Sequence, residues 1–393
     1  MTKRILSALL ATLLCAFCIA PMCVYAETSE SSKTLPAGLV INCVGDSITW
    51  GSGSTNKIDG KCDKEAYYPG QLEKLIGSNN CTIYVDAKPG ASLLPDFAPG
   101  SVSVGGYASV ADIIPSFDRE DLDIVILMLG TNDSKVTRTD NGVYKVGIWD
   151  VRGAAQNFEA EYKELLEIYF NMESKPFVYC MLPPPSLPEE VAPNYRITDA
   201  NMKDEIIPII NKVVSEYQEQ GYPVGTIDIR SAFPDPETEQ DELVSVLADG
   251  VHPNAAGYTI MAETIYNQML KDTHVLNYEA DGADDPAGVP KSTSFFGNAT
   301  VKVKNTRGLV TKNGVANTGW STEPNGGGTI YKEGDEITFT AETADITLYP
   351  VWGTAAGNSG SSSNGLTIAI IAIGAILVVG LFAAGVIVLK KNK

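Results

Sequence analysis

Histidine and basic residues are scarce in this sequence, and two common catalytic motifs are missing from it. Only two histidines occur, His252 and His274, so any histidine-based catalysis must use one of them. There is no Gly-x-Ser-x-Gly elbow and no His-Glu-x-x-His motif, which removes the usual support for a lipase or a zinc protease. Lys and Arg number 29 against 48 Asp and Glu, a formal net charge of -19, and this balance disfavours nucleic acid as a partner.

The N-terminal segment has the features of a targeting signal. Lys3 and Arg4 precede a long apolar run, and Val24-Tyr25-Ala26 is a small-x-small cleavage site. Residues 1–26 are therefore predicted to be a secretory signal peptide that is removed from the mature protein.

The C-terminal segment 366–389 is apolar without interruption and is followed by the lysine-rich tail 390–393. As a helix it would span roughly 36 Å at 1.5 Å per residue, enough to cross a bilayer core of about 30 Å. The lysines predict a cytoplasmic tail, and the Gly/Ser-rich residues 354–365 predict a flexible stalk. The sequence thus predicts a cell-surface, single-pass membrane protein with extracellular N-terminal domains.

From residue 38 to 275, after a polar linker at 27–37, strand-like apolar runs alternate with helical patterns. The predicted strands are Leu39–Val44, Thr82–Asp86, Asp123–Leu129, Phe177–Leu182 and Gly225–Ile229. The predicted helices are Tyr68–Ile76, Ala108–Phe117, Ala154–Phe170, Asp204–Tyr217 and Asn254–Leu270. Central strands that are apolar throughout are typical of a parallel sheet covered on both faces. We therefore predict a three-layer α/β/α domain of flavodoxin-like type over residues 38–275.

A smaller unit follows this domain. Residues 276–295 lack an apolar period and are predicted to be an acidic linker. The segment 296–353 holds short alternating runs such as Thr300–Val303, Ile337–Thr340 and Ile346–Tyr349, separated by Gly and Asn. This pattern predicts a small all-β module.

Four cysteines remain outside the signal peptide: Cys43, Cys62, Cys81 and Cys180. An even number in an oxidising compartment permits disulfides, and three complete pairings are conceivable. Cys43 and Cys180 fall in predicted buried strands, where a free thiol acts as a small apolar side chain. Cys62 with Cys81 is the favoured bridge.

The candidate catalytic segment is Gly45-Asp46-Ser47, directly after the first predicted strand. A serine in a sharp turn at the carboxyl end of a strand lies where open α/β sheets place their ligands. The alternative is that Asp46 and Ser47 only cap a helix.

The segment Asp249-Gly250-Val251-His252 supplies a matching acid–base pair. An aspartate three residues before a histidine can reach the imidazole Nδ1–H and fix the tautomer, which leaves Nε2 to take a proton from a serine. The alternative is a plain turn and helix cap. The other histidine, His274, follows a helical pattern at its end, where a solvated position explains it without a catalytic role.

Two further segments offer hydrogen-bond donors at the same edge of the predicted sheet. Asn132, in Gly130-Thr131-Asn132-Asp133, follows the most apolar strand, and Gly90 follows the strand Thr82–Asp86. Donors that converge beside a serine can form an oxyanion hole. Ordinary turn chemistry is the alternative, because Asn and Gly are common in turns.

Together these four segments resemble the sequence blocks of the SGNH (GDSL-type) hydrolases, over about residues 38–275. The resemblance implies an esterase in which Ser47 is the nucleophile, His252 the general base and then acid, and Asp249 its orienting partner. It needs no metal and no cofactor.

The same resemblance implies an oxyanion hole formed by the backbone N–H groups of Ser47 and Gly90 and by the Asn132 side chain. One departure concerns the second block. The family usually has an Asn shortly before the glycine of this block, whereas this sequence has Val85-Asp86-Ala87-Lys88-Pro89-Gly90, so Gly90 matches the block without that Asn.

Within the family, the sequence is similar to bacterial sialate O-acetylesterases and acetylxylan esterases. Tyr68-Pro69, Leu182-Pro183-Pro184-Pro185 and the segment 249–255 carry this similarity. It implies the removal of short acyl groups, such as acetyl, from an acetylated carbohydrate.

Three aromatic residues are candidates for substrate binding: Trp50, Tyr67 and Trp149. Each is of a type that stacks on sugar rings, and ordinary packing in the core is the alternative for each.

The segment Gly319-Trp320-Ser321, closed by Leu348–Trp352, resembles a Listeria–Bacteroides (internalin B-type) repeat. That family is a small β-grasp-like module of surface proteins, which implies a spacer.

Two other functions stay open for the whole chain. One is the same chemistry on lipids, as in a lysophospholipase or thioesterase, and the other is a non-enzymatic surface adhesin in which the β module binds.

Overall fold

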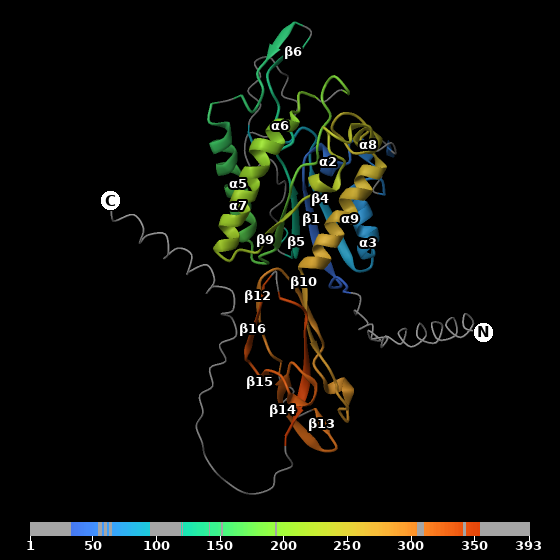
Figure 1. Cartoon of the computed structure of the whole chain (residues 1–393), viewed down its shortest axis with the longest axis vertical. Coiled ribbons are helices and arrows are strands. Elements are labelled where there is room, and N and C mark those ends of the chain that lie inside the picture. The colour runs from blue at the N-terminus through green and yellow to red at the C-terminus, as the bar shows by residue number, and fades with distance from the viewer. Residues whose placement is uncertain are drawn as a thin grey trace, which may run out of the picture.

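The computed structural model has an α/β part that carries helices and a β part below it (Figure 1). It describes residues 33–53, 57–58, 61–62, 65–94, 119, 121–140, 142–150, 152–192, 195–304, 310–340 and 343–353. The predicted signal peptide, stalk, membrane span and tail lie outside these residues, as does the predicted helix Ala108–Phe117. Within the described residues, no helix is long and apolar enough to span a membrane.

A five-stranded parallel sheet forms the centre of the α/β part. In spatial order its strands are β4 (Cys81–Ala87), β1 (Leu39–Gly45), β5 (Ile124–Met128), β8 (Phe177–Met181) and β9 (Val224–Ile227). Numbered along the chain, this order is 2-1-3-4-5, which is the flavodoxin-like order. The predicted α/β class with a parallel sheet is therefore confirmed.

Helices cover both faces of this sheet (Figure 1). The pair on one face is α3 (Tyr68–Ile76) with α9 (Ala255–Asp272), and the pair on the other is α5 (Ala154–Phe170) with α7 (Ile207–Glu219). β5 explains the two layers, because Ile126 joins the core under α9 whereas Leu127 joins the core under α5. Successive side chains of a strand point to opposite faces, so an all-apolar strand requires cover on both.

The helix predicted at Asp204–Tyr217 is longer than expected and irregular at its start. It runs without a break through α6 (Asp199–Asn201), a π-helical segment (Met202–Ile206) and α7. Pro208 has no N–H to donate to the carbonyl of Asp204, and this loss favours a local widening of the helix.

Short elements make up the rest of the α/β part. They are α2 (Ser47–Trp50), α8 (Gln240–Val246), a 3-10 turn (Arg230–Ala232), the pair β2 (Lys57–Ile58) with β3 (Lys61–Cys62), and the pair β6 (Arg138–Asp140) with β7 (Val143–Lys145).

The β part begins directly after α9, without a linker. β10 (Thr273–Tyr278) pairs in parallel with β17 (Ile346–Trp352) and antiparallel with β11 (Thr293–Phe296). The prediction that 276–295 is a linker is therefore wrong, since this segment contains the end of β10 and the start of β11. The other strands are β12 (Ala299–Lys302), β13 (Thr311–Lys312), β14 (Val315–Ser321), β15 (Ile330–Tyr331) and β16 (Glu336–Phe339). In the described residues this part has strands and short 3-10 turns only, as the prediction of an all-β module requires.

His274 lies in β10 and not at a solvated helix end, so that expectation is wrong. Its side chain is only 2% exposed. The imidazole packs beside the rings of Phe295 and Phe339, with centroid distances of 5.9 and 5.6 Å. Burial lowers the pKa of His274, as expected for a base whose charged form loses hydration.

The described cysteines Cys43, Cys81 and Cys180 are buried free thiols. The favoured bridge between Cys62 and Cys81 is therefore wrong. The Cys81 thiol instead donates to the carbonyl oxygen of Gly77, with a distance of 3.8 Å from Sγ. Cys43 and Cys180 act as apolar fillers as predicted, and burial raises the pKa of each thiol to about 12.

Candidate active site

Ser47 begins α2, immediately beyond the carboxyl end of β1. Asp46 caps this helix, because its Oδ1 accepts a hydrogen bond from the Ile48 N–H at 2.9 Å. A Cβ at Gly45 would lie 2.3 Å from Thr49 Oγ1, so the strand can pass into this turn only with glycine there. Capping falls to the Asp46 side chain and leaves the Ser47 hydroxyl available.

Asp249 and His252 lie in the turn that precedes α9. Asp249 Oδ1 accepts hydrogen bonds from the backbone N–H groups of Val251 and His252, at 2.8 and 2.7 Å. Its other oxygen, Oδ2, lies 2.9 Å from His252 Nδ1. The carboxylate therefore fixes both the turn and the imidazole, as the three-residue spacing predicts.

His252 Nε2 lies 2.8 Å from Ser47 Oγ, which completes a hydrogen-bonded series from Asp249 to Ser47. Tyr258 supports this approach from α9. Its hydroxyl lies 3.0 Å from the carbonyl oxygen of Ile48 and 2.6 Å from that of Ser52. The helix that follows His252 thus holds the loop that contains Ser47.

Asp249 is ionised in this environment. Burial acts to raise its pKa, but hydrogen bonds from the His252 ring and from the backbone of His252 and Val251 outweigh it and lower the pKa to about 2. An ionised Asp249 holds the proton on Nδ1 of His252, which leaves Nε2 to accept the serine proton.

The segments that carry Gly90 and Asn132 meet beside this series. Asn132 Nδ2 donates to the carbonyl oxygen of Ala91 at 2.9 Å and lies 3.4 Å from Asp46 Oδ2. Gly90 precedes Ala91 and has a φ of 82°, in a turn closed by the hydrogen bond from Ala91 N–H to Lys88 O at 3.0 Å. The predicted convergence of three loops at the carboxyl ends of β4, β1 and β5 is therefore present.

Two carboxyl groups lie under this site in environments that oppose ionisation. Asp46 and Asp133 are fully buried. Burial raises the pKa of Asp46 to about 6 and that of Asp133 to about 7, against the lowering effect of backbone hydrogen bonds. Asp133 Oδ1 accepts from Leu94 N–H at 2.9 Å, whereas its Oδ2 has no hydrogen-bond partner in the described residues.

The three aromatic candidates for substrate binding differ in how they are packed. Trp50, at the end of α2, is 40% exposed and keeps an open face. Tyr67 is only 9% exposed and belongs to the core beneath α3. Trp149 packs against Phe158, with a centroid distance of 5.9 Å in an edge-to-face arrangement. Packing explains Tyr67 and Trp149, and substrate stacking stays a prediction for Trp50.

Tyr195 is a contact of the triad that the sequence analysis missed. Its hydroxyl donates to Asp249 Oδ2 at 3.2 Å, and its ring lies edge-to-face with the His252 imidazole at 5.5 Å. The ring is 52% exposed, and φ at Tyr195 is 54°, a value that non-glycine residues rarely adopt. In the sequence, Tyr195 stands out only as an aromatic residue in a polar loop. Many residues share this feature, so it could not predict a contact with the triad.

A serine, a histidine and an aspartate that are hydrogen-bonded in series have the arrangement of a serine-hydrolase triad. In the described part of the chain, no group of three or more His, Cys, Asp or Glu side chains could hold a metal ion. The chain belongs to the GDSL-like lipase/acylhydrolase family, whose model matches residues 43–260.

A curated relative and two solved structures are similar to this chain. Over 246 residues it is 27% identical to an acetylxylan esterase of Xylanibacter ruminicola, which covers 59% of this chain and 44% of that protein, so the chain spans less than half of the relative's length. A carbohydrate acetylesterase from Sinorhizobium meliloti matches with a TM-score of 0.40 and 16% identity, over 58% of this chain and 97% of that one. A family two carbohydrate esterase from Clostridium thermocellum matches with a TM-score of 0.41 and 17% identity, over 60% and 64%.

The Tyr195 hydroxyl is expected to position Asp249. Tyr195→Phe should lower kcat for ester hydrolysis about two- to tenfold and leave KM unchanged, the rate equivalent of one hydrogen bond worth about 0.5–1.5 kcal/mol. Tyr222→Phe, on an exposed tyrosine elsewhere, is the matched control. Equal kcat values for wild type and Tyr195→Phe would contradict a positioning role.

Buried Asp133 is expected to make the folded state less stable as pH rises. The carboxyl titrates at about 7 when folded and at about 3.9 when unfolded. The folded state therefore binds the extra proton between these values, and stability is lost as pH rises through this interval. Urea unfolding at pH 4.5 and at pH 7.5 measures this loss. Between the two pH values, the free energy of unfolding should fall less for Asp133→Asn than for wild type. An exposed control, Asp121→Asn, should follow wild type, and parallel losses in all three proteins would disprove the effect.

Proposed function

We propose that this chain is a carboxylic ester hydrolase that removes short acyl groups, such as acetyl, from carbohydrate through an acyl-serine intermediate. The observation that carries the proposal is the series of hydrogen bonds from Asp249 through His252 to Ser47. Membership of the GDSL-like lipase/acylhydrolase family supports the reaction class. The relative named as an acetylxylan esterase supports acetylated carbohydrate as the substrate class.

In the first half of the reaction, Ser47 Oγ attacks the ester carbonyl carbon while its proton passes to His252 Nε2. Asp249 stabilises the imidazolium that forms. The tetrahedral intermediate then collapses, the carbon–oxygen bond to the sugar breaks, and the sugar oxygen takes the proton from His252. In the second half, His252 removes a proton from water, and this water attacks the acyl-serine carbonyl carbon. The bond from that carbon to Ser47 Oγ then breaks, Ser47 Oγ takes the proton back from His252, and the acid is released.

The negative charge on the intermediate requires donors beside Ser47. We assign this role to the backbone N–H groups of Ser47 and Gly90 and to Asn132 Nδ2. One Nδ2 hydrogen is engaged by Ala91 O at 2.9 Å, whereas the contact to Asp46 at 3.4 Å is long for a hydrogen bond. The second hydrogen is the one that an oxyanion would recruit.

The ends of the chain extend the proposal to location. A signal peptide at 1–26 and a membrane span at 366–389 would leave the hydrolase outside the cell, held by a single C-terminal helix. In this arrangement the β part and the stalk at 354–365 are a spacer between enzyme and membrane.

Serine dependence and acyl-chain length test the proposal together. We expect acetate release from acetylated oligosaccharides, a fall of roughly a million-fold in kcat for Ser47→Ala, and little turnover of acyl esters longer than a few carbons. Ser245→Ala on α8 is the control. Serine-dependent turnover of long-chain esters would show that the substrates are lipids. Hydrolysis that persists in Ser47→Ala would show that Ser47 is not the nucleophile.

Asn132→Ala should lower kcat by about 10²–10³, the usual loss of one oxyanion donor. Asn42→Ala is a matched control, because Asn42 is likewise a buried amide whose Nδ2 donates a hydrogen bond, in its case to Asp86 Oδ2 at 3.0 Å. Both variants should lower the thermal midpoint, but only Asn132→Ala should lower kcat. If kcat were similar for both variants, Asn132 would not be an oxyanion donor.

A further inference from the structure

Tyr195 is joined to the triad by its polar end and leaves apolar ring surface open to solvent. Its hydroxyl donates to Asp249 Oδ2 at 3.2 Å, and its ring lies edge-to-face with the His252 imidazole at 5.5 Å. The residue is nevertheless 52% exposed, more than any other aromatic residue whose exposure the structure describes. A tyrosine usually packs its ring inside and turns the hydroxyl to water. The opposite arrangement leaves an aromatic surface open beside the catalytic histidine.

The backbone that carries this ring has a conformation that non-glycine residues rarely adopt. The angle φ is 54° at Tyr195 and 70° at Arg196, and both values lie in the left-handed region. Two hydrogen bonds fix the turn: Arg196 O accepts from Val136 N–H at 3.1 Å, and Arg196 Nη1 donates to Val146 O at 3.3 Å. Strain of this kind persists only where the surrounding structure enforces it, and it is concentrated at functional sites. The ring is therefore held in place before any substrate binds.

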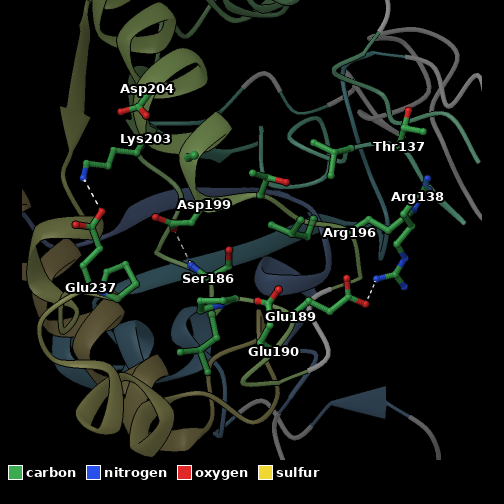
Figure 2. Close-up of a pocket in the computed structure, with 17 residues that line it drawn as sticks. Thr137, Arg138, Ser186, Glu189, Glu190, Arg196, Asp199, Lys203, Asp204 and Glu237 are labelled. Carbon is green, nitrogen blue, oxygen red and sulfur yellow. Dashed lines mark hydrogen bonds and ion pairs between the residues drawn. The ribbon is translucent and has the colours of Figure 1, made fainter. Parts of the chain in front are cut away.

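The turn sends two successive side chains to different places. Arg196 lines the polar cavity drawn in Figure 2. Tyr195 does not line that cavity and contacts His252 and Asp249 instead. The strained turn thus presents the Tyr195 ring, and not the Arg196 guanidinium, to the triad.

The chemistry of the reaction decides which half of the ester lies near this ring. His252 Nε2 takes the proton of Ser47 and must then give it to the oxygen of the departing alcohol. The alcohol oxygen therefore comes within hydrogen-bond reach of Nε2, about 2.6–3.2 Å. The carbonyl oxygen points to the oxyanion donors instead, and the acyl chain extends from the carbonyl carbon in a third direction. The alcohol half is thus the part of the ester beside the imidazole.

The size and surface of a sugar suit the open ring. A single imidazole separates the Tyr195 ring, at 5.5 Å between centroids, from the hydrogen bond of 2.8 Å between His252 Nε2 and Ser47 Oγ. A six-membered sugar ring on the departing oxygen is large enough to extend past that imidazole. One face of such a sugar presents mainly C–H groups, which gain dispersion contacts and lose water against an aromatic face. A short open-chain alcohol has no such face.

We propose that the Tyr195 ring is the contact surface for the sugar ring of the departing alcohol, and that it makes the enzyme prefer such alcohols to short open-chain ones. The inference rests on the proposed function, and it adds a residue that selects the alcohol half of the ester without selecting the acyl half. The hydroxyl positions Asp249, whereas the ring contacts the substrate, so the two parts of this side chain have separable effects.

Two substitutions in the full-length protein separate the ring from the hydroxyl. Tyr195→Phe removes the hydroxyl and keeps the ring, whereas Tyr195→Leu removes both. Neither new side chain is β-branched, so both variants keep a comparable backbone penalty at a φ of 54°. The substrates are ethyl acetate and acetylated xylo-, cello- and manno-oligosaccharides. All of them form the same acetyl-Ser47 and differ only in the alcohol.

The measurement is kcat/KM for the oligosaccharide that wild type hydrolyses fastest, divided by kcat/KM for ethyl acetate. Tyr195→Leu should lower this ratio about two- to tenfold, the rate equivalent of one aromatic contact. Tyr195→Phe should keep the wild-type ratio, although its kcat falls on both substrates. Tyr222→Leu, on another exposed tyrosine, is the control and should also keep the ratio. The preference for ethyl acetate over ethyl butyrate should stay the same in all three variants, because the acyl half does not meet the ring.

The possible results separate the ring contact from the esterase. A wild-type ratio in Tyr195→Leu, an equal fall in Tyr195→Phe, or a changed acyl preference in Tyr195→Leu would overturn the ring contact and leave the esterase intact. Hydrolysis of ethyl acetate that persists in Ser47→Ala would instead overturn the esterase. A wild-type enzyme that hydrolyses ethyl acetate but no acetylated oligosaccharide would overturn the sugar as the alcohol, and the ring contact with it. A fall confined to Tyr195→Leu supports the contact.

Discussion

The hydrogen bond between Ser47 Oγ and His252 Nε2 joins residues that are 205 positions apart, and most of the α/β part serves to hold them together. β1 delivers Ser47 to the sheet edge, and α9 follows directly on the turn that carries His252. Tyr258 then ties α9 to the backbone around α2. Because parallel strands end at the same edge, the loop after β5 reaches the same place and brings Asn132 with it. The convergence of these loops is thus a consequence of strand order.

The carboxyl groups near this bond have opposite electrostatic environments. Asp249 gains hydrogen bonds from backbone N–H groups and from the imidazole, which keep its pKa low. Asp46 and Asp133 are buried without enough donors, and burial raises the pKa of both. Asp46 nevertheless caps α2 and lies beside Asn132, so a group that costs stability at neutral pH also fixes the segment with the nucleophile. Strain of this kind is common where function and stability compete.

The sequence predicted the five strands of the parallel sheet, the helices that fall within the described residues, and the pairing of Asp249 with His252. Each of these predictions rests on local periodicity or on short spacing. Non-local packing accounts for what it did not predict. His274 looks like a helix end locally, but strand pairing with β11 and β17 buries it. Whether Tyr67 is open to a ligand depends on the core beneath α3, and the reach of Tyr195 to Asp249 depends on the fold of a loop without a motif. The polar cavity in Figure 2 likewise collects five separate segments, 136–138, 186–190, 196–200, 203–204 and 236–237, which no window of sequence can reveal.

The central claim is that Ser47 is a nucleophile activated by His252. The most direct measurement is the reaction of the protein with a fluorophosphonate, followed by intact mass and peptide mapping. The account predicts one adduct per chain, located on Ser47, and a strongly reduced labelling rate in His252→Ala while Ser245 and Ser186 stay unlabelled. A folded protein that takes up no label, or that is labelled at another serine, would contradict the account.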